Sequence, residues 1–212
     1  MSTERAVAAN LLDIQAVFLR PEEPFTWASG IKSPIYCDNR LVLSFPEKRS
    51  IVVDGFVKLI QETYPDADCL MGTATAGIPW AAMTAEKMNL PMGYVRSSNK
   101  THGKENKIEG KIAAGDKVVI VEDLISTGGS VQGVVEALRD AGAVVLGVVA
   151  IFTYELPKAT KTFADLNTPF ATLSNYSELI QVALEKSYIK EADLAKLNAW
   201  KQDPNDESWM QK

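Results

Sequence analysis

The chain has 212 residues, of which 46% are hydrophobic and 23% are charged, as in an ordinary globular protein. A net charge of −5 argues against general attraction to nucleic acid or to an anionic membrane. No apolar run approaches the roughly 20 residues that span a bilayer, the acidic N-terminal segment lacks the apolar core of a signal peptide, and the cysteines form no metal-binding or disulfide pattern. We therefore expect a cytoplasmic protein of one domain, over residues 1–212, with neither nucleic acid nor membrane as a partner.

The N-terminal region combines helical and extended patterns. Apolar residues recur at helical spacing and predict an amphipathic first helix: Val7, Leu11, Ile14 and Phe18. The stretch FTWASGIKSPIYCD (25–38) predicts two short extended runs, and Pro34 favours an edge strand or a loop there. Ser44 and Glu47 have the spacing of a capping box, so they predict the start of a helix that stops at Pro65.

The middle of the chain alternates between strands and helices. A strand is predicted near residues 69–71, and the small residues of GTATAG (72–77) follow it as a loop. Pro79 then falls in the first turn of the next predicted helix. Another short strand is predicted at 92–95, whereas residues 97–110 contain almost no apolar side chains.

The second half of the chain continues the alternation. Residues 117–121 predict a strand, and the helix after it, which ends at Gly142, has one apolar face: Val131, Val134, Val135 and Leu138. Residues 143–152 form a nearly continuous aliphatic run, which is typical of a strand covered on both faces. The C-terminal part adds a short strand and two helices, near 170–173, 176–187 and 190–201. This order predicts an α/β fold with a mostly parallel central sheet flanked by helices, in which ligands bind at the carboxyl ends of the strands.

Two adjacent carboxylates and a loop of small residues follow an aliphatic strand in VVIVEDLISTGGS (118–130). The loop can direct backbone N–H groups, and the hydroxyls of Thr127 and Ser130, at an anion such as a phosphate monoester. Glu122 and Asp123 cannot bind the same phosphate, because like charges repel, but they can accept hydrogen bonds from hydroxyl groups beside it or hold a divalent cation. A diol and a phosphate on one molecule describe a ribose 5-phosphate group.

VVIVEDLISTGGS resembles the phosphoribosyl-diphosphate motif of the type I phosphoribosyltransferases at all 13 positions. The resemblance implies that the two acids hold the ribose hydroxyls and that the loop holds the 5′-phosphate. The implied contacts with phosphoribosyl diphosphate are Glu122, Asp123, Leu124, Ile125, Ser126, Thr127, Gly128, Gly129 and Ser130. A plain strand end before a turn is the alternative, but it does not explain the small-residue loop. GTATAG (72–77) matches the pyrophosphate loop of this family, with a plain strand-to-helix turn as its alternative.

Residues 96–111, RSSNKTHGKENKIEGK, contain five basic residues, two acids and the only histidine of the chain. A solvated loop is one interpretation of this segment. In a phosphoribosyltransferase it has a second use, because displacement of pyrophosphate adds negative charge to the leaving group and leaves positive charge on the sugar. A loop carrying Arg96, Lys100 and His102 can close over the site, exclude water and offset that negative charge. We therefore predict these three residues as catalytic and as contacts of the donor.

Two stretches are similar to the orotate phosphoribosyltransferases in particular. The pattern R-x3-K-x-H-G (96–103) resembles their catalytic loop, and SGIKSPIY, within residues 25–38, resembles their hood over the base. The resemblance covers roughly residues 1–175, with the hood mainly in 1–40. It implies the transfer of phosphoribosyl from 5-phosphoribosyl 1-diphosphate to orotate, which gives orotidine 5′-monophosphate and pyrophosphate in pyrimidine biosynthesis.

The same resemblance implies Mg²⁺ as a cofactor, held chiefly by substrate oxygens and water and not by dedicated protein ligands. It implies a homodimer in which the lid residues act in the partner's site, and it assigns Ser126 to orotate. Some relatives carry basic residues, absent here, at four places: Ala28, Thr75-Ala76, Ser97 and near 152–154. The carboxylate of orotate is therefore left without an assigned cation, and backbone N–H groups and Lys32 are its candidates.

Two other functions fit parts of this pattern. A phosphoribosyltransferase for another base, such as a purine, would use the same motif, but SGIKSPIY argues for orotate. A regulator that senses phosphoribosyl diphosphate without catalysis would need a basic face for nucleic acid, and the chain is acidic. We expect a buried, unreactive Cys37 and packing or dimer contacts for the four tryptophans, Trp27, Trp80, Trp200 and Trp209.

Overall fold

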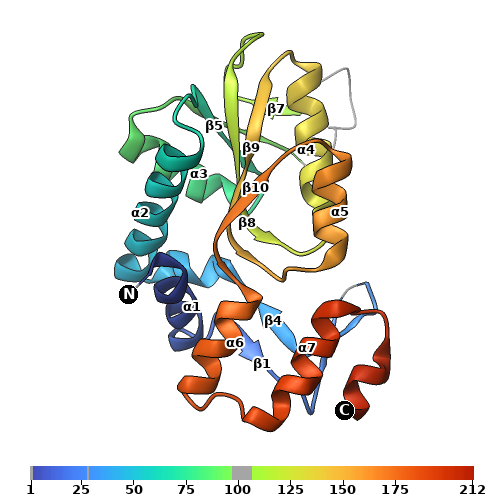
Figure 1. The fold of residues 1–212 in the computed structure, drawn as a ribbon. Coiled ribbons are helices and arrows are strands. Elements are labelled where there is room, and N and C mark those ends of the chain that lie inside the picture. Colours follow the sequence, from blue (N-terminus) through green and yellow to red (C-terminus); the bar gives the residue numbers. More distant parts are fainter. Residues whose placement is uncertain (1, 28, 97–106) are drawn as a thin grey trace.

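Within the residues that the structure describes, six strands form one sheet at the centre of the molecule (Figure 1). This computed structural model describes residues 2–27, 29–96 and 107–212. The strand order is β10-β9-β8-β5-β6-β7. The strands are β5 (Cys69–Thr73), β6 (Met92–Val95), β7 (Ile108–Glu109), β8 (Lys117–Ile125), β9 (Val144–Thr153) and β10 (Phe170–Asn175). All neighbours pair in parallel except β6 with β7, which confirms the predicted mostly parallel sheet.

Helices cover both faces of this sheet (Figure 1). The α-helices of the described ranges are α1 (Thr3–Asp13), α2 (Pro46–Thr63), α3 (Gly77–Met88), α4 (Gly129–Asp140), α5 (Pro157–Asp165), α6 (Tyr176–Glu185) and α7 (Leu194–Gln202), and the first five of them provide this cover. Successive residues of a strand point to opposite faces. Val119 and Val121 of β8 therefore join the core under α1, α2 and α3, while Val118 and Ile120 join the core under α4 and α5. None of the helices in the described ranges is both long and apolar enough to cross a membrane.

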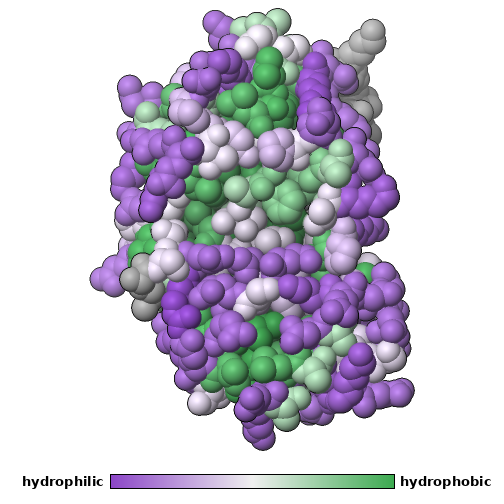
Figure 2. All heavy atoms as spheres, viewed as in Figure 1, coloured by the Kyte–Doolittle hydropathy of each residue, from purple (hydrophilic) through white to green (hydrophobic). Residues whose placement is uncertain are grey.

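Short strands from the first 40 residues lie beside the C-terminal helices, where Figure 1 shows β1, β4, α6 and α7 together below the central sheet. They pair antiparallel, β1 (Val17–Leu19) with β4 (Ile35–Cys37) and β2 (Phe25–Thr26) with β3 (Lys32–Ser33). The indole Nε1 of Trp200 on α7 donates a hydrogen bond to the backbone oxygen of Lys32 at 3.0 Å. Figure 2 shows hydrophilic residues crossing the middle of this face between two more hydrophobic areas. This hydrogen bond joins the C-terminal helices to the N-terminal strands.

The first helix is shorter than its apolar spacing predicts. It ends at Asp13, and Gln15 has a left-handed backbone with φ 56°. Phe18 therefore lies in β1, opposite Tyr36 of β4. The prediction of Phe18 as a helical residue is wrong, because apolar spacing carries no information about the turn at Gln15.

The second helix begins at Pro46, without a side-chain hydrogen bond at its N-cap. Ser44 is instead the last residue of a 3-10 helix, Asn39–Ser44. The predicted capping box of Ser44 and Glu47 is therefore wrong, because Pro46 fixes the start of α2 through its own φ angle. Neither α5 nor the two-residue β7 is predicted from the sequence.

Candidate active site

The carboxyl end of β8 has one paired edge and one open edge. It pairs with β5 only as far as Val121, but with β9 as far as Ile125. Glu122 and Asp123 therefore lie inside the strand, and the predicted strand end at Val121 is wrong, because pairing with β9 continues past it. Since β5 turns away into residues 74–76, an open edge lies beside the two acids.

Hydrogen bonds connect the acid pair to the loop that follows it and to the N-terminal region. Glu122 is 5% exposed, and its Oε1 accepts from the backbone N–H of Asp123 at 2.9 Å. Its Oε2 accepts from the hydroxyl of Ser130 at 3.2 Å. The backbone oxygen of Asp123 accepts from Nδ2 of Asn39 at 2.7 Å. Both predicted acids and the last predicted loop residue therefore belong to one cluster.

Burial makes ionisation of this acid pair unfavourable. Burial, and then the charge of neighbouring Asp123, raise the pKa of Glu122 to about 8. Burial also raises the pKa of Asp123, while its hydrogen bond with Glu122 and the charge of Arg40 oppose that rise. A ligand stabilises the ionised form of such a pair when it replaces the hydrogen bonds that water would donate to the carboxylates. Hydroxyl groups that donate hydrogen bonds, or a nearby cation, meet this requirement.

The predicted phosphate-binding loop leads directly into α4. Gly128 is the N-cap of this helix and has φ 79°, and no side chain in the described ranges caps the helix there. The left-handed backbone favours glycine here, and a Cβ at Gly128 would also lie only 3.1 Å from the ring of Phe163. The first N–H groups of α4 are therefore available to an anion.

A cavity of about 340 Å³ lies between the acid pair, the 74–76 loop and residues 37–40. Its lining residues are Cys37, Asp38, Arg40, Ala74, Thr75, Ala76, Glu122, Asp123, Leu124 and Ser130. The cavity brings together the two motifs that the sequence presents 45 residues apart, from Gly77 to Glu122. A Cβ on Gly77 would collide with the backbone oxygen of Val121. Glycine therefore lets α3 begin this close to β8.

Three consecutive residues, Asp38, Asn39 and Arg40, border this site although no sequence pattern assigns them to it. Asp38 and Arg40 line the cavity. Asn39 is fully buried, and its Oδ1 accepts from the thiol of Cys37 at 3.3 Å. Cys37 itself is buried and burial raises the pKa of its thiol well above the ordinary value, as expected for an unreactive cysteine. The signal in the sequence was a polar triplet directly after SPIYC.

The predicted lid residues fall mostly beyond the described ranges. Lys100 and His102 lie outside the described residues, so their catalytic roles stay a prediction. Arg96 follows β6, its backbone N–H donates to Lys107 at 2.9 Å, and its Nε lies 3.3 Å from Oε1 of Glu109. Among the described residues, Arg96 is not part of the cavity lining.

Aromatic rings pack together beside the N-terminal strands. The ring centroids of Trp27 and Tyr154 are 5.2 Å apart, and those of Tyr154 and Trp200 are 5.9 Å apart. Tyr154 is buried, and burial raises the pKa of its hydroxyl well above the ordinary value. Trp80 and Trp209 are buried as well, as the packing prediction requires. A neutral ring thus occupies the region where some relatives place an arginine.

The two residues suggested for the base are not in the cavity lining. Ser126 follows β8 and is half-buried. Nζ of Lys32 donates to the hydroxyl of Thr26 at 2.7 Å, on the exposed side of the β2–β3 pair. The assignment of Ser126 to orotate and of Lys32 to its carboxylate therefore stays a prediction.

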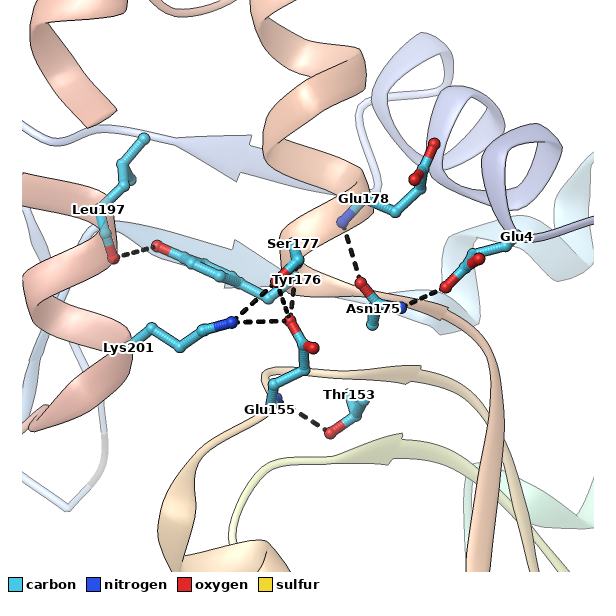
Figure 3. A network of polar contacts seen from close by, with 9 residues as sticks. All are labelled: Glu4, Thr153, Glu155, Asn175, Tyr176, Ser177, Glu178, Leu197 and Lys201. Carbon is cyan, nitrogen blue, oxygen red and sulfur yellow. Dashed lines mark hydrogen bonds and ion pairs between the residues drawn. The ribbon is translucent and has the colours of Figure 1, made fainter. Parts of the chain in front are cut away.

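A polar network fixes the chain where β9 passes toward α5 (Figure 3). Glu155 has φ 56°, and its Oε2 accepts from the N–H and hydroxyl of Ser177 at 2.8 and 2.5 Å and from Nζ of Lys201 at 3.2 Å. Burial alone would raise the pKa of Glu155, but the hydrogen bonds of Ser177 and the charge of Lys201 bring it below the ordinary value. Lys201 follows Trp200 on α7, so this network holds the aromatic cluster against the sheet.

Metal binding by protein groups alone finds no support in the described ranges. These residues contain no cluster of three or more acid, histidine or cysteine side chains able to hold a metal ion.

Comparison with known proteins gives one consistent result. Residues 46–186 match the family model described as "Phosphoribosyl transferase domain". The chain is 57% identical over 209 residues to an orotate phosphoribosyltransferase of Bacillus subtilis, covering 99% of this chain and 97% of that protein. It is also 57% identical over 210 residues to an orotate phosphoribosyltransferase of Streptococcus thermophilus, covering 99% of this chain and 100% of that protein.

Solved structures agree with these sequence relatives. An orotate phosphoribosyltransferase of Aeropyrum pernix superposes with a TM-score of 0.75 at 28% identity, covering 87% of this chain and 99% of that one. A UMP synthase of Leishmania donovani superposes with a TM-score of 0.79 at 27% identity, covering 93% of this chain and 42% of that one. The fold resembles both over most of its length.

Proposed function

This chain belongs to the orotate phosphoribosyltransferases, with the type I phosphoribosyltransferase fold, and we propose how its residues serve the reaction of that family. It is a pentosyltransferase that moves the 5-phosphoribosyl group of 5-phosphoribosyl 1-diphosphate to orotate, in pyrimidine biosynthesis. The observation that carries this function is the cavity in which the acid pair, the 74–76 loop and Ser130 meet.

The donor would lie along the carboxyl end of β8. The carboxyl groups of Glu122 and Asp123 would accept hydrogen bonds from the two ribose hydroxyls, and these donors would favour the ionised forms that burial disfavours. The loop 126–130 would hold the 5′-phosphate with backbone N–H groups at the start of α4. This arrangement would leave C1 of the ribose and its diphosphate in the cavity that residues 74–76 line.

The reaction exchanges one bond at C1 for another. The C1–oxygen bond of the donor breaks with its electron pair leaving on the diphosphate, and a deprotonated ring nitrogen of orotate forms the new bond to C1. Arg96, Lys100 and His102 would close over the site, keep water from the cationic sugar and offset the charge of the leaving group. Ser126 would contact orotate.

The acids and the open cavity fit a substrate-borne Mg²⁺ better than a protein-held one. No described residues form a metal-binding cluster, so the ion would be held by diphosphate oxygens and water, near the carboxylates that line the cavity. When bound, Mg²⁺ offsets the negative charge of the diphosphate. The residues of this chain would then orient the ribose and position the leaving group.

Exposed apolar side chains support a homodimer as the working assembly. Five of them lie between the first strand and the second helix, within residues 18–51, and are between 36% and 43% exposed: Phe18, Tyr36, Leu41, Phe45 and Ile51. A second copy of the chain would remove this surface from water. In such a dimer the lid residues of one chain would act in the site of the other.

We place this enzyme in the cytoplasm.

The decisive experiment supplies phosphoribosyl diphosphate and Mg²⁺ and compares orotate, uracil, adenine and hypoxanthine as acceptors. Of the four bases, only orotate is expected to cause the release of diphosphate, and free orotate should be consumed at the same time. Faster release with a purine would establish the specificity of another phosphoribosyltransferase. Tight binding of the donor without release in the presence of any base would instead point to a sensor.

A further inference from the structure

The cavity beside the acid pair is poor in positive charge. Among its described lining residues, Arg40 has the one cationic side chain, against the carboxylates of Asp38, Glu122 and Asp123. The loop on the opposite side, residues 74–76, presents only alanine and threonine side chains. A diphosphate in this cavity would therefore find its nearest protein cation, within the described ranges, at Arg40.

Arg40 is held in place by its neighbour Asp38. Its Nε donates to Oδ1 of Asp38 at 2.6 Å and its Nη2 donates to Oδ2 at 2.8 Å, in a bidentate pair. The backbone N–H of Arg40 also donates to Oδ1 at 3.1 Å. These hydrogen bonds lower the pKa of Asp38, so the carboxylate stays charged and keeps the guanidinium oriented. The arrangement removes much of the rotamer freedom that an exposed arginine otherwise has.

The other edge of the same guanidinium remains open. The Asp38 contact uses Nε and one hydrogen of Nη2, and in the described part of the chain Nη1 donates no hydrogen bond. The side chain of Arg40 is 63% exposed. A planar guanidinium has five N–H donors, and its free edge matches two oxygens of a phosphate group. Arg40 is thus both preorganised and available.

We propose that Arg40 binds the diphosphate group of the donor and supplies the positive charge that the 74–76 loop lacks. This role rests on the proposed function and adds a binding residue to it. The diphosphate is favoured over the other two anionic groups of the reaction by position. Arg40 shares its cavity with residues 74–76. Of the proposed 5′-phosphate loop only Ser130, whose hydroxyl donates to Glu122, is among the described lining residues, and neither Ser126 nor Tyr154 is. The bond to C1 leaves its electron pair on the diphosphate, so this contact strengthens as the leaving group departs.

Calorimetry on the full chain with two probes tests this assignment. Diphosphate with Mg²⁺ reports the contact with Arg40, and ribose 5-phosphate, which carries no diphosphate, reports the acid pair and the 126–130 loop. The variants are Arg40→Gln, Arg40→Lys and a matched control, Lys161→Gln, which removes an exposed cation paired with Asp165 on α5.

Arg40→Gln is expected to raise the Kd of diphosphate about tenfold, which corresponds to about 1.4 kcal/mol. The Kd of ribose 5-phosphate should change by less than about twofold, and Lys161→Gln should change neither. Arg40→Lys keeps the charge but loses the planar guanidinium, which can bind Asp38 along one edge and diphosphate along the other. Its Kd for diphosphate should therefore lie between those of the wild type and Arg40→Gln. If Arg40→Gln does not fold, this lysine variant carries the comparison.

The outcomes separate this inference from the function beneath it. If the wild type binds both probes and Arg40→Gln binds diphosphate with unchanged affinity, the role of Arg40 is overturned and the proposed function is not. Equal weakening of both probes would also overturn it, because the substitution would then act on the whole site. Failure of the wild type to bind either probe would instead overturn the proposed function.

Discussion

Asn39 donates a hydrogen bond from its side-chain amide to the backbone oxygen of Asp123 across 2.7 Å, although the two residues are 84 positions apart in the chain. Asn39 is fully buried, and its side-chain oxygen also accepts from the thiol of Cys37. One amide therefore connects the N-terminal strands to the acid pair of β8. This hydrogen bond forms beyond Val121, where β8 no longer pairs with β5.

Replacement of Asn39 by alanine should destabilise the protein and disturb the acid pair. The backbone oxygen of Asp123 would lose its donor in a largely buried position, which costs about 1–3 kcal/mol of unfolding free energy. Urea denaturation measures this loss, and Asn205→Ala, at an exposed position of the C-terminal segment, is the matched control. An unfolding free energy equal to that of the control would contradict a structural role for this amide.

Stability without substrate should fall as pH rises, because of Glu122. Its pKa is raised by burial from an ordinary value of 4.5 to about 8 in the folded protein. Between these values the folded state keeps a proton that the unfolded state has released, so the unfolding free energy decreases with rising pH. This contribution is complete below about pH 4.5 and is lost as pH passes about 8.

Glu122→Gln removes the titrating group and keeps an amide that can still hydrogen-bond to Ser130. We expect the difference in unfolding free energy between wild type and this variant to change steadily between pH 5 and pH 8, to the disadvantage of the wild type. Urea denaturation at several pH values, without diphosphate or ribose 5-phosphate, gives this difference directly. Two parallel pH profiles would show that Glu122 does not titrate in this range.

The ion pair of Lys201 and Glu155 should contribute more to the unfolding free energy than an exposed surface pair does. Their side chains are 27% and 31% exposed, and the pair belongs to the network with Ser177. Lys201→Met should therefore lower the unfolding free energy by about 1 kcal/mol, whereas exposed pairs contribute less than that.

The matched comparison for this pair is Lys161→Met, whose partner Asp165 lies one helical turn away on α5 and whose side chain is 76% exposed. A small or unmeasurable loss is expected there. Because Trp200 neighbours Lys201, tryptophan fluorescence should also shift in Lys201→Met. Equal losses in the two variants, with no spectral change, would contradict the role of the network in holding α7.

The fold and the acidic motif were readable because both are local patterns. Alternating aliphatic strands and apolar-faced helices predict the parallel sheet, and the 118–130 stretch is continuous in the chain. Where predictions from local sequence patterns were wrong, strand pairing with a distant segment determined the structure. Phe18 follows helical spacing but pairs with Tyr36, and β8 continues past Val121 because β9 continues beside it.

The contributions of Asp38, Asn39 and Arg40 could not be predicted for the same reason. Asn39 donates a hydrogen bond across the gap between residues 37–40 and the end of β8, and Asp38 and Arg40 line the cavity there. Only tertiary packing closes that gap. A polar triplet after an extended segment is typical of an ordinary helix start, which Asp38 also provides through its cap on Arg40. The structure adds a second role, because the triplet also borders the cavity beside the acid pair.

Hybrid dimers test whether lid and acid pair of one site come from different chains. Lys100→Ala should lower kcat more than donor affinity, because its charge would act on the leaving group, while Asp123→Asn should weaken donor binding. In a mixture of the two variants, a dimer holding one chain of each has one site with both defects and one site with neither. Activity should therefore rise above that of either variant alone after the chains are unfolded together and refolded. Mixtures that stay at the level of the single variants would mean that each site is built from one chain, since every site would then carry one defect.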